Sequence, residues 1–185
     1  MNWRSLFDEA AASQHEEQLR ERLSEVADRT RRERATRTLM DRLAADWSRI
    51  EVVVSSQRVL VGDVGDVGAD WFTIRASDRR NWLVPRHAVV QVASQGGRPA
   101  GTAPPSLRRM RIGYALRALA RGRVAVIVDD VLGRSLTGTI EAVGSDAIDL
   151  AVHPVDQPPR HASPANRRVL AIGALSCVGG QAGHL

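Results

Sequence analysis

The amino-terminal part of the chain places its apolar residues at a helical spacing. Trp3, Leu6, Phe7 and Ala10 fall on one face of a helix. Residues 13–48 contain no proline or glycine and are rich in helix-forming residues. The pattern therefore predicts one long α-helix over residues 1–48, with an apolar tip at its beginning.

The middle of this predicted helix is polar. Leu19, Leu23 and Val26 continue a spacing of four and three residues that is typical of a coiled coil, but Thr30 follows in that register. A second apolar face begins at Leu39 and suits packing on the domain that follows. The predicted helix thus has two apolar ends separated by a polar segment.

Beyond residue 49 the apolar period changes to two, which indicates β-strands. The first set of predicted strands comprises Ile50–Val54, Val59–Val67, Trp71–Arg75 and one or two strands within Trp82–Val92. The Gly, Pro and Ser content of Ser94–Ser106 predicts a linker. After the linker we predict a short helix at Leu107–Arg121 and strands at Val124–Val128, Leu136–Val143, Ala147–Val152 and Val169–Val178.

The strand regions contain an internal repeat. The sequence LVGDVGDVGADWFTI of Leu60–Ile74 corresponds to LTGTIEAVGSDAIDL of Leu136–Leu150, 76 positions later. The closing strands match at an offset of 86 positions, so that Leu170 corresponds to Val84. The larger offset predicts a loop insertion at about 153–168. Glycine in a strand permits a bend or a close backbone approach, and aspartate suits turns. The residues assigned these structural roles are Gly62, Gly68, Asp70, Gly138, Gly144 and Asp146.

These elements predict an α+β protein, mainly β. We expect a long N-terminal helix (1–48), a first small barrel of short antiparallel strands (49–93) and a linker (94–106). A short helix with a second barrel follows over 107–180, and residues 181–185 form a tail.

The order of elements in each half resembles the Sm-like (LSm-type) small barrel. A helix precedes a strand, a turn, a strand with a bend-forming glycine, the phrase Val-Gly-x-Asp at 67–70 and 143–146, and closing strands. The whole arrangement also resembles an uncharacterised actinobacterial family with an Arg-rich leading helix and two tandem Sm-like units. That family supplies no activity.

The resemblance implies single-stranded RNA binding and ring assembly through edge strands. Sm-like nucleotide sites use an Asp, an Asn and an Arg-Gly pair, and this chain departs from that pattern. It has Gly68 and Gly144 in place of the Asp, Phe72 and Ile148 in place of the Asn, and Arg86-His87 and Ile172-Gly173 in place of the pair. We therefore expect the usual RNA pocket to be absent, although Trp71, Phe72 or Trp82 would stack on a base if exposed.

Composition adds little about partners. Hydrophobic content of 43% and charged content of 25% indicate a globular protein. All 26 basic residues are arginine, so the net charge of +5 reflects a compositional bias as much as a nucleic-acid partner. The single cysteine, Cys177, forms no intramolecular disulfide, and the chain has no apolar run long enough to span a membrane. We expect a cytoplasmic location.

Candidate chemistry is sparse. The sequence has no GxxxxGK[ST] phosphate loop, Ser135 and Ser176 lack a nucleophile-elbow setting, and Cys177 has no evident base. His153, Asp156 and His161 have an irregular spacing for a metal site. Asp129 and Asp130 precede Gly133 in a predicted hairpin turn, where local backbone hydrogen bonds explain them. We therefore predict no catalytic residues, no cofactor and no metal.

Two functional hypotheses follow. The first is a non-catalytic adaptor or assembly protein that contacts a protein partner or another copy of itself through the long helix and the barrel edges, with Trp3, Leu6 and Phe7 as partner-binding candidates. The alternative is a regulatory protein associated with RNA or DNA. Its candidate residues are Arg29, Arg31, Arg32, Arg34 and Arg37. Neither hypothesis involves a membrane or a small-molecule substrate.

Overall fold

The structure is a computed structural model that describes residues 25, 35–45, 47–77, 80–95, 106–154 and 166–181. The chain divides into two compact units, Met1–Thr38 and Leu39–Leu185. No helix among the described residues is long and apolar enough to cross a membrane.

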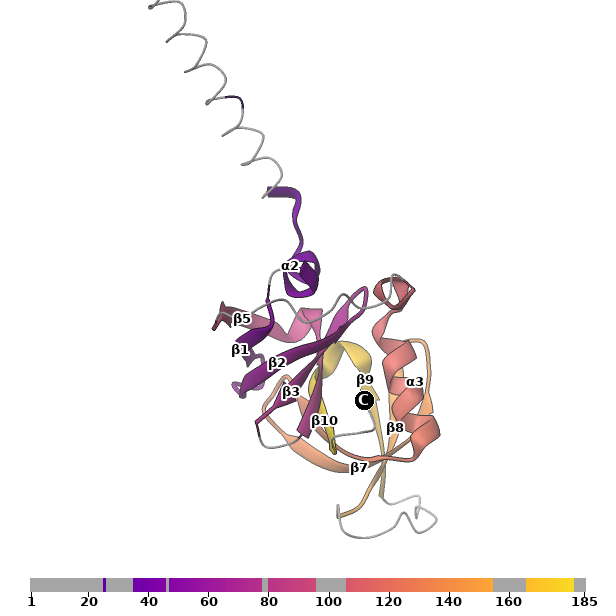
Figure 1. Cartoon of the computed structure of the whole chain (residues 1–185). Helices are drawn as coiled ribbons and strands as arrows, with labels where there is room; N and C mark the ends of the chain where they lie inside the picture. Colours follow the sequence, from indigo (N-terminus) through magenta and orange to yellow (C-terminus); the bar gives the residue numbers. More distant parts are fainter. Residues whose placement is uncertain are drawn as a thin grey trace, which may run out of the picture. The chain divides into compact units, whose positions relative to one another are not determined.

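The second unit is built mainly from short strands (Figure 1). Its first half contains α2 (Leu39–Ala45), β1 (Arg49–Val54), β2 (Val59–Val67), β3 (Trp71–Ala76), β4 (Arg80–Pro85), the 3-10 turn η1 (Arg86–Ala88) and β5 (Val89–Ser94). Its second half contains η2 (Leu107–Arg109), α3 (Ile112–Gly122), β6 (Ala125–Asp130), β7 (Ser135–Val143), β8 (Ala147–Val152), β9 (Arg167–Ala171), η4 (Ile172–Ala174) and β10 (Leu175–Gln181).

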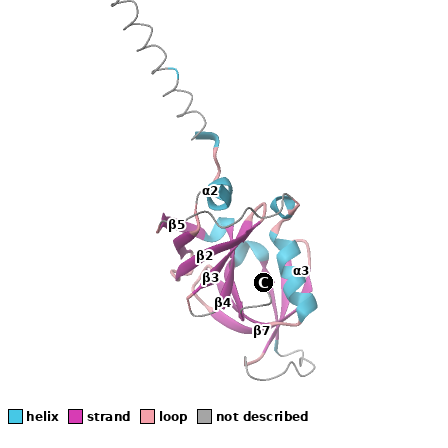
Figure 2. Cartoon of the chain, in the orientation of Figure 1, coloured by secondary structure: helices cyan, strands magenta, loops and turns pink. Residues whose placement is uncertain are grey.

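All the strands of the described residues belong to one ten-stranded antiparallel sheet in the order β5-β1-β2-β3-β4-β10-β6-β7-β8-β9. Figure 2 shows the strands in magenta. The alternation expected of a half-buried strand is clearest in β1, where Ile50, Val52 and Val54 are buried between more exposed neighbours. The sheet therefore forms where the sequence changes to a period of two.

The predicted pair of closed barrels is wrong, because the sheet is open. Within each half the last strand pairs with the first, as β5 does with β1 and β10 with β6. The fourth strand of the first half does not close on its own half. Instead β4 pairs with β10, and this pairing merges the halves into one sheet.

The predicted long N-terminal helix, and with it the coiled coil, is also wrong. Within the described residues the main α-helices are α2 and α3, and both are short. Helix α2 has 7 residues. Arg37 and Thr38 are not helical, so the helix does not continue through them to Ser48. Helix α2 is a separate element because Met40 and Leu43 are buried in the core of the first half.

The two halves share their local geometry as well as their strand order. Ser55 N–H donates to the Ala88 carbonyl at 2.8 Å, and the equivalent Val131 N–H donates to the Ala174 carbonyl at 3.0 Å. The pairing of β1 with β5 and the pairing of β6 with β10 each contain one shift in strand register, and the two shifts fall at equivalent positions. The sequence repeat is therefore a repeat of structure, and we call the residues 76 or 86 positions apart counterparts.

Each half has its own hydrophobic core, but the two cores exchange residues. Helix α3 covers the second core through Leu116 and Leu119, which are buried among residues of β6, β7 and β8. Leu83, from β4 of the first half, belongs to the second core, whereas Cys177, from β10 of the second half, belongs to the first. The halves are thus interlocked by side chains as well as by backbone hydrogen bonds.

The repeated glycines Gly62 and Gly138 allow neighbouring strands to approach closely. A Cβ at Gly62 would collide with the Arg75 carbonyl on β3, and one at Gly138 would collide with the Ala151 carbonyl on β8. Any other residue would force these strand pairs apart.

Candidate functional site

The strand pair β4·β10, which we call the joint, holds the two halves together. In its register Leu83 lies opposite Val178 and Trp82 lies opposite Gly179. Both apolar partners, Leu83 and Val178, are fully buried. A Cβ at Gly179 would come within 2.7 Å of the Trp82 ring, so glycine is required for the indole to occupy this position.

An ion pair crosses the joint beside Trp82. The Arg58 Nε lies 2.5 Å from Asp129 Oδ2, and the Arg58 guanidinium lies 4.7 Å from the centre of the Trp82 ring. The Asp129 side chain is 3% exposed and also accepts a hydrogen bond from the Ser135 hydroxyl. The hydrogen bond to Asp129 raises the pKa of Arg58 above its ordinary value, so the guanidinium stays charged.

The cysteine at the joint is held as a thiol. Cys177 is completely buried, and its Sγ lies 3.5 Å from Asp129 Oδ2. Burial, followed by the neighbouring Asp129 carboxylate, raises the pKa of Cys177 far above its ordinary value. Since the thiolate is the nucleophilic form, this group is poorly suited to nucleophilic or redox chemistry.

Ser176 and His87 make further polar contacts between the halves. The Ser176 Oγ accepts a hydrogen bond from Ser56 N–H at 2.9 Å and lies 3.2 Å from Ser55 Oγ. The His87 Nε2 lies 3.1 Å from the Leu175 carbonyl, to which it donates because a carbonyl only accepts. The joint is therefore fixed by side chains from several elements of both halves.

The sheet ends in β5 and β9, whose outer edges pair with no other strand among the described residues. Apolar side chains stand on both edge strands: Val90 is 69% exposed and Val169 is 68% exposed. Open strand edges are sites where another extended chain can pair. These two edges are the first candidate interaction surface.

A basic surface on η2 and α3 is the second candidate. The exposed arginines of this segment are Arg108, Arg109, Arg111, Arg117, Arg121 and Arg123, and residues 107–123 contain no acidic residue. Tyr114 stands between them on α3 and is 45% exposed. In Figure 1, α3 lies along the outside of the second half.

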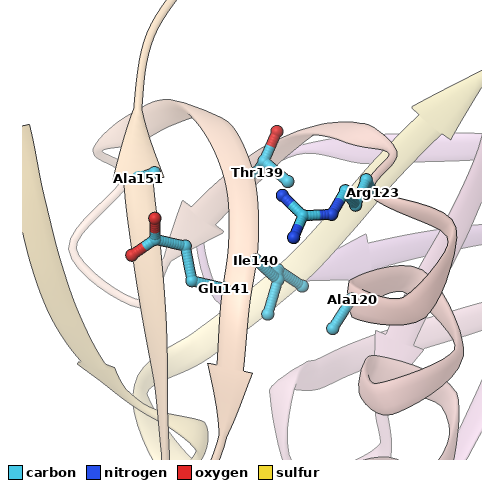
Figure 3. Close-up of a pocket in the computed structure, with 6 residues that line it drawn as sticks. All are labelled: Ala120, Arg123, Thr139, Ile140, Glu141 and Ala151. Carbon is cyan, nitrogen blue, oxygen red and sulfur yellow. The ribbon is translucent and has the colours of Figure 1, made fainter. Parts of the chain in front are cut away.

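A small cavity lies between the end of α3 and strand β7 (Figure 3). It has a volume of about 130 Å³ and is lined by Ala120, Arg123, Thr139, Ile140, Glu141 and Ala151. The Glu141 carboxylate points away from the Arg123 guanidinium and is paired with Arg167 at 2.8 Å. Cavities that hold metabolites are usually several hundred Å³, so this one is too small for such a ligand.

Most residues predicted to bind partners lie outside the described part of the chain. This applies to Trp3, Leu6, Phe7, Arg29, Arg31, Arg32 and Arg34. Arg37 is described and exposed. The aromatic residues considered for base stacking, Trp71, Phe72 and Trp82, are all buried and therefore present no stacking surface.

The repeated glycine-aspartate turns differ between the halves. Asp70 Oδ1 accepts a hydrogen bond from Ile112 N–H at 2.7 Å, so the turn of the first half caps the start of α3 in the second. Gly68 lies against the Trp71 indole, and the indole N–H donates to the Met110 carbonyl at 2.9 Å. Asp146 is exposed and contacts the Ser145 hydroxyl at 3.3 Å, whereas a Cβ at Gly144 would lie 3.3 Å from the Ala147 carbonyl.

The residues considered for a metal site are not brought together in the described structure. Asp156 and His161 lie outside it, and no group of three or more His, Cys, Asp or Glu residues within it is arranged to hold a metal. Both ring nitrogens of His153 are engaged: Nδ1 lies 2.7 Å from the Pro154 carbonyl, and Nε2 lies 2.8 Å from Thr139 Oγ1.

Sequence reasoning missed the Arg58–Asp129 pair. Asp130 does act as a turn residue, since its Oδ1 accepts hydrogen bonds from Leu132 N–H and Arg134 N–H. Burial acts to raise the pKa of Asp130, but the hydrogen bonds from Arg134 and Leu132 outweigh it and hold the pKa below its ordinary value. Asp129 instead points at a residue 71 positions away, and no local pattern indicates such a pairing.

No protein-family model matches this sequence, and no curated protein or solved structure matches it significantly.

Proposed function

We propose that the protein is a non-catalytic assembly or adaptor protein that binds an extended segment of a protein partner at the free edges of its sheet. The main observation in support is that β5 and β9 form the two open edges of the described sheet, and that each carries an exposed valine, Val90 or Val169. Natural proteins usually protect such edges, because an open edge invites another strand to pair with it. A partner strand added at either edge would gain backbone hydrogen bonds and cover the exposed valine on that edge.

The chemical groups of the joint also support a non-catalytic role. The Asp129 carboxylate is engaged by Arg58 and Ser135, and Cys177 is buried as a thiol. These groups stabilise the contact between the halves. None of them lines the small cavity near Arg123. A cytoplasmic location, expected from the sequence, belongs to the same proposal.

The test is photo-crosslinking from the sheet edges in the cells that make the protein. A photoreactive phenylalanine analogue is placed at Val90 or at Val169, with Val59 as the matched control because it is 53% exposed on the non-edge strand β2. We expect protein adducts of defined mass from both edge positions and not from Val59. Equal labelling at all three positions, or none at the edges, would refute the proposal.

Nucleic-acid binding is the second candidate function, favoured by the basic surface of η2 and α3. A helix that presents arginines without acidic neighbours can follow phosphates, and Tyr114 offers a face for base stacking. Binding of this kind weakens steeply as salt is raised.

The measurement is binding of fluorescent single- and double-stranded oligonucleotides between about 50 and 200 mM salt, a range over which phosphate contacts lose much of their strength. Arg117→Glu with Arg121→Glu should abolish binding, whereas Arg75→Glu on the exposed side of β3 should leave it intact. Equal loss in the control, or no binding at low salt, would reject this function.

A further inference from the structure

The small cavity at the end of α3 lies at a position where the first half of the repeat carries a tryptophan. We infer that this cavity binds a tryptophan side chain of a protein partner, with the Arg123 guanidinium stacked on the indole ring. The site goes beyond the edge contacts of the proposed function and does not depend on them, because none of its lining residues belongs to β5 or β9.

The tryptophan of the first half is Trp47, and its counterpart is Arg123, 76 positions later. Each residue comes shortly after the helix of its half, which ends at Ala45 in α2 and at Gly122 in α3. Trp47 is partly buried and packs against the core of the first half, whereas Arg123 is exposed. The second half therefore has no apolar side chain of its own at the position that Trp47 occupies in the first.

The walls of the cavity correspond to residues of the first core. Ala120 and Ile140 line the cavity, and their counterparts are Ala44 and Val64. Both counterparts belong to the buried cluster against which Trp47 packs. An apolar surface of the kind that Trp47 covers in the first half is thus accessible at the end of α3.

The backbone also differs between the two counterparts. Arg123 has φ 47°, in the left-handed region, whereas Trp47 does not have a positive φ. The two side chains therefore leave the chain in different directions. On the opposite wall Ala151 stands where the first half has the larger Arg75, which gives the cavity further room.

The polar groups around the cavity, apart from Arg123, are engaged elsewhere. Thr139 Oγ1 lies 2.8 Å from His153 Nε2, and Glu141 pairs with Arg167 at 2.8 Å. In Figure 3 the Thr139 oxygen and the Glu141 carboxylate both point away from the Arg123 guanidinium. No acidic side chain in the described part of the chain pairs with Arg123. Its guanidinium is therefore available to a ligand.

The size of the cavity fits an aromatic ring. Its volume is about 130 Å³, and an engineered apolar cavity of about 150 Å³ binds benzene. Ala120, Ile140 and Ala151 supply the apolar wall, while Arg123 and Glu141 are exposed, so the cavity opens to solvent between them. A ring attached to another protein can enter from that side.

The guanidinium favours tryptophan over other apolar side chains. Arginine stacks on aromatic faces, and the attraction is strongest for the indole ring. The protein already uses this contact at the joint, where the Arg58 guanidinium lies 4.7 Å from the centre of the Trp82 ring. Tryptophan is also among the residues that contribute most to binding when they fill a pocket at a protein interface.

Titration of the full-length protein with indole tests the site, followed by NMR of the labelled backbone amides. We expect saturable shifts at Arg123 and Ile140. Ala120→Leu should weaken indole binding by about tenfold or more, because its added carbons fill the space that the ring needs. Ala118→Leu is the matched control, since Ala118 is exposed on the same helix, and it should bind indole like the wild type.

A second variant keeps the test valid if Ala120→Leu does not fold. Arg123→Gln changes an exposed side chain and should weaken indole binding by about threefold or more, because stacking of the guanidinium is lost. Arg121→Gln, also exposed but not in the cavity wall, should have no effect. Circular dichroism and thermal melting check the fold of every variant.

Three results of the titration would overturn the inference. The first is the absence of saturable shifts with indole. The second is equal weakening of binding in Ala120→Leu and Ala118→Leu. The third comes from isobutyrate, which pairs a carboxylate with a small apolar body. If isobutyrate shifts the Arg123 amide and indole does not, the cavity recognises carboxylates and not aromatic rings.

Photo-crosslinking identifies the source of the tryptophan. A photoreactive phenylalanine analogue at Glu141, at the mouth of the cavity, should form an adduct with a tryptophan-containing segment of another protein. Indole and the Ala120→Leu change should each suppress that adduct. An adduct that persists under both conditions would refute binding in the cavity. An adduct with Trp3 of the same chain would refute a partner as the occupant.

The outcomes separate the inference from the proposed function. Protein adducts from Val90 and Val169 without indole binding would support strand addition at the edges and refute the tryptophan site. Indole binding and the adduct at Glu141 without edge adducts would support the tryptophan site and refute strand addition.

Discussion

The joint and the two free edges are made from the same repeated segments, yet they differ in how their contacts are fixed. In the joint, strand pairing is reinforced by the Arg58–Asp129 ion pair and by hydrogen bonds of Ser176. Near one edge the counterpart positions, Val53 on β1 and Val90 on β5, are apolar. Buried polar groups fix one partner in one geometry, because any other arrangement leaves them unsatisfied. An apolar edge supports contacts that can form and separate.

The largest difference between joint and edge should appear when an apolar side chain is shortened on each. Leu83→Ala removes a fully buried side chain from the joint and should lower the free energy of unfolding by about 2–5 kcal/mol. Its counterpart change Val169→Ala, at a site that is 68% exposed, should cost no more than about 0.5 kcal/mol in a monomer. Urea unfolding at low protein concentration measures both, and equal losses would contradict the comparison.

The ion pair should give the next largest effect. Arg58→Ala leaves the Asp129 carboxylate, which is 3% exposed, without its cation. We expect a loss of about 2 kcal/mol, below the range for a fully buried pair because Arg58 itself is partly exposed.

The matched control for the ion pair is Arg134→Ala, since Arg134 is the counterpart of Arg58 and pairs with Asp130. The Arg134 side chain is 71% exposed, and its backbone N–H continues to hold Asp130 after the change. We expect a loss of at most about 1 kcal/mol. Thermal unfolding of both variants would contradict the ranking if Arg134→Ala were the more damaging change.

Loss of the helix cap should be smaller again. Asp70→Ala removes the acceptor for Ile112 N–H at the start of α3 and should cost about 1 kcal/mol. Its counterpart Asp146 caps no described helix, so Asp146→Ala should be near neutral. Hydrogen exchange of the first α3 amides should rise in Asp70→Ala only, and a rise in both variants would argue against a specific cap.

The smallest effect concerns the equivalent turns before β2 and β7. Gln57 has φ 65°, a left-handed conformation, and its counterpart Gly133 has φ 79°. Gln57→Gly should therefore stabilise the protein by about 0.5 kcal/mol, whereas Gly133→Gln should destabilise it by a similar amount. A destabilised Gln57→Gly variant would show that the Gln57 side chain makes a compensating contact.

Much of the fold could be predicted from the apolar periodicity of the strands and from the internal repeat. The predicted strands Val59–Val67 and Ala147–Val152 coincide with β2 and β8, because each strand has one clearly apolar face. The repeat identified at Gly62 and Gly138 also indicated two equivalent halves. These features are local, or recur at a fixed spacing, and therefore leave a signal in the sequence.

Strand pairing between the halves left no such signal. The sequences of β4 and β10 do not indicate whether the free side of each strand pairs within its own half or with a strand of the other half. We assumed closure within each half and predicted two barrels, which was wrong. The Arg58–Asp129 pair escaped notice for the same reason, since it depends on the joint.

The long-helix prediction failed for a different reason. Helix propensity over residues 13–48 is high, but Met40 and Leu43 gain more by packing into the first core than by extending a solvated helix. Trp3, Leu6 and Phe7 remain predicted partner-binding residues, because they lie outside the described part of the chain. The arginines Arg108 to Arg123 can be read from the sequence, but their exposure on η2, on α3 and beside α3 is known only from the structure.

The position of β10 has a consequence for synthesis. Among the described strands β10 leaves the ribosome last, yet it lies in the interior of the sheet between β4 and β6. Until Leu175–Gln181 has been translated, both neighbours expose the edges that it will cover. Nascent chains on one message would thus carry unsatisfied strands of matching register, a state that favours exchange of β10 between neighbouring polypeptides. A stop codon before Leu175 would remove a strand from the interior of the sheet.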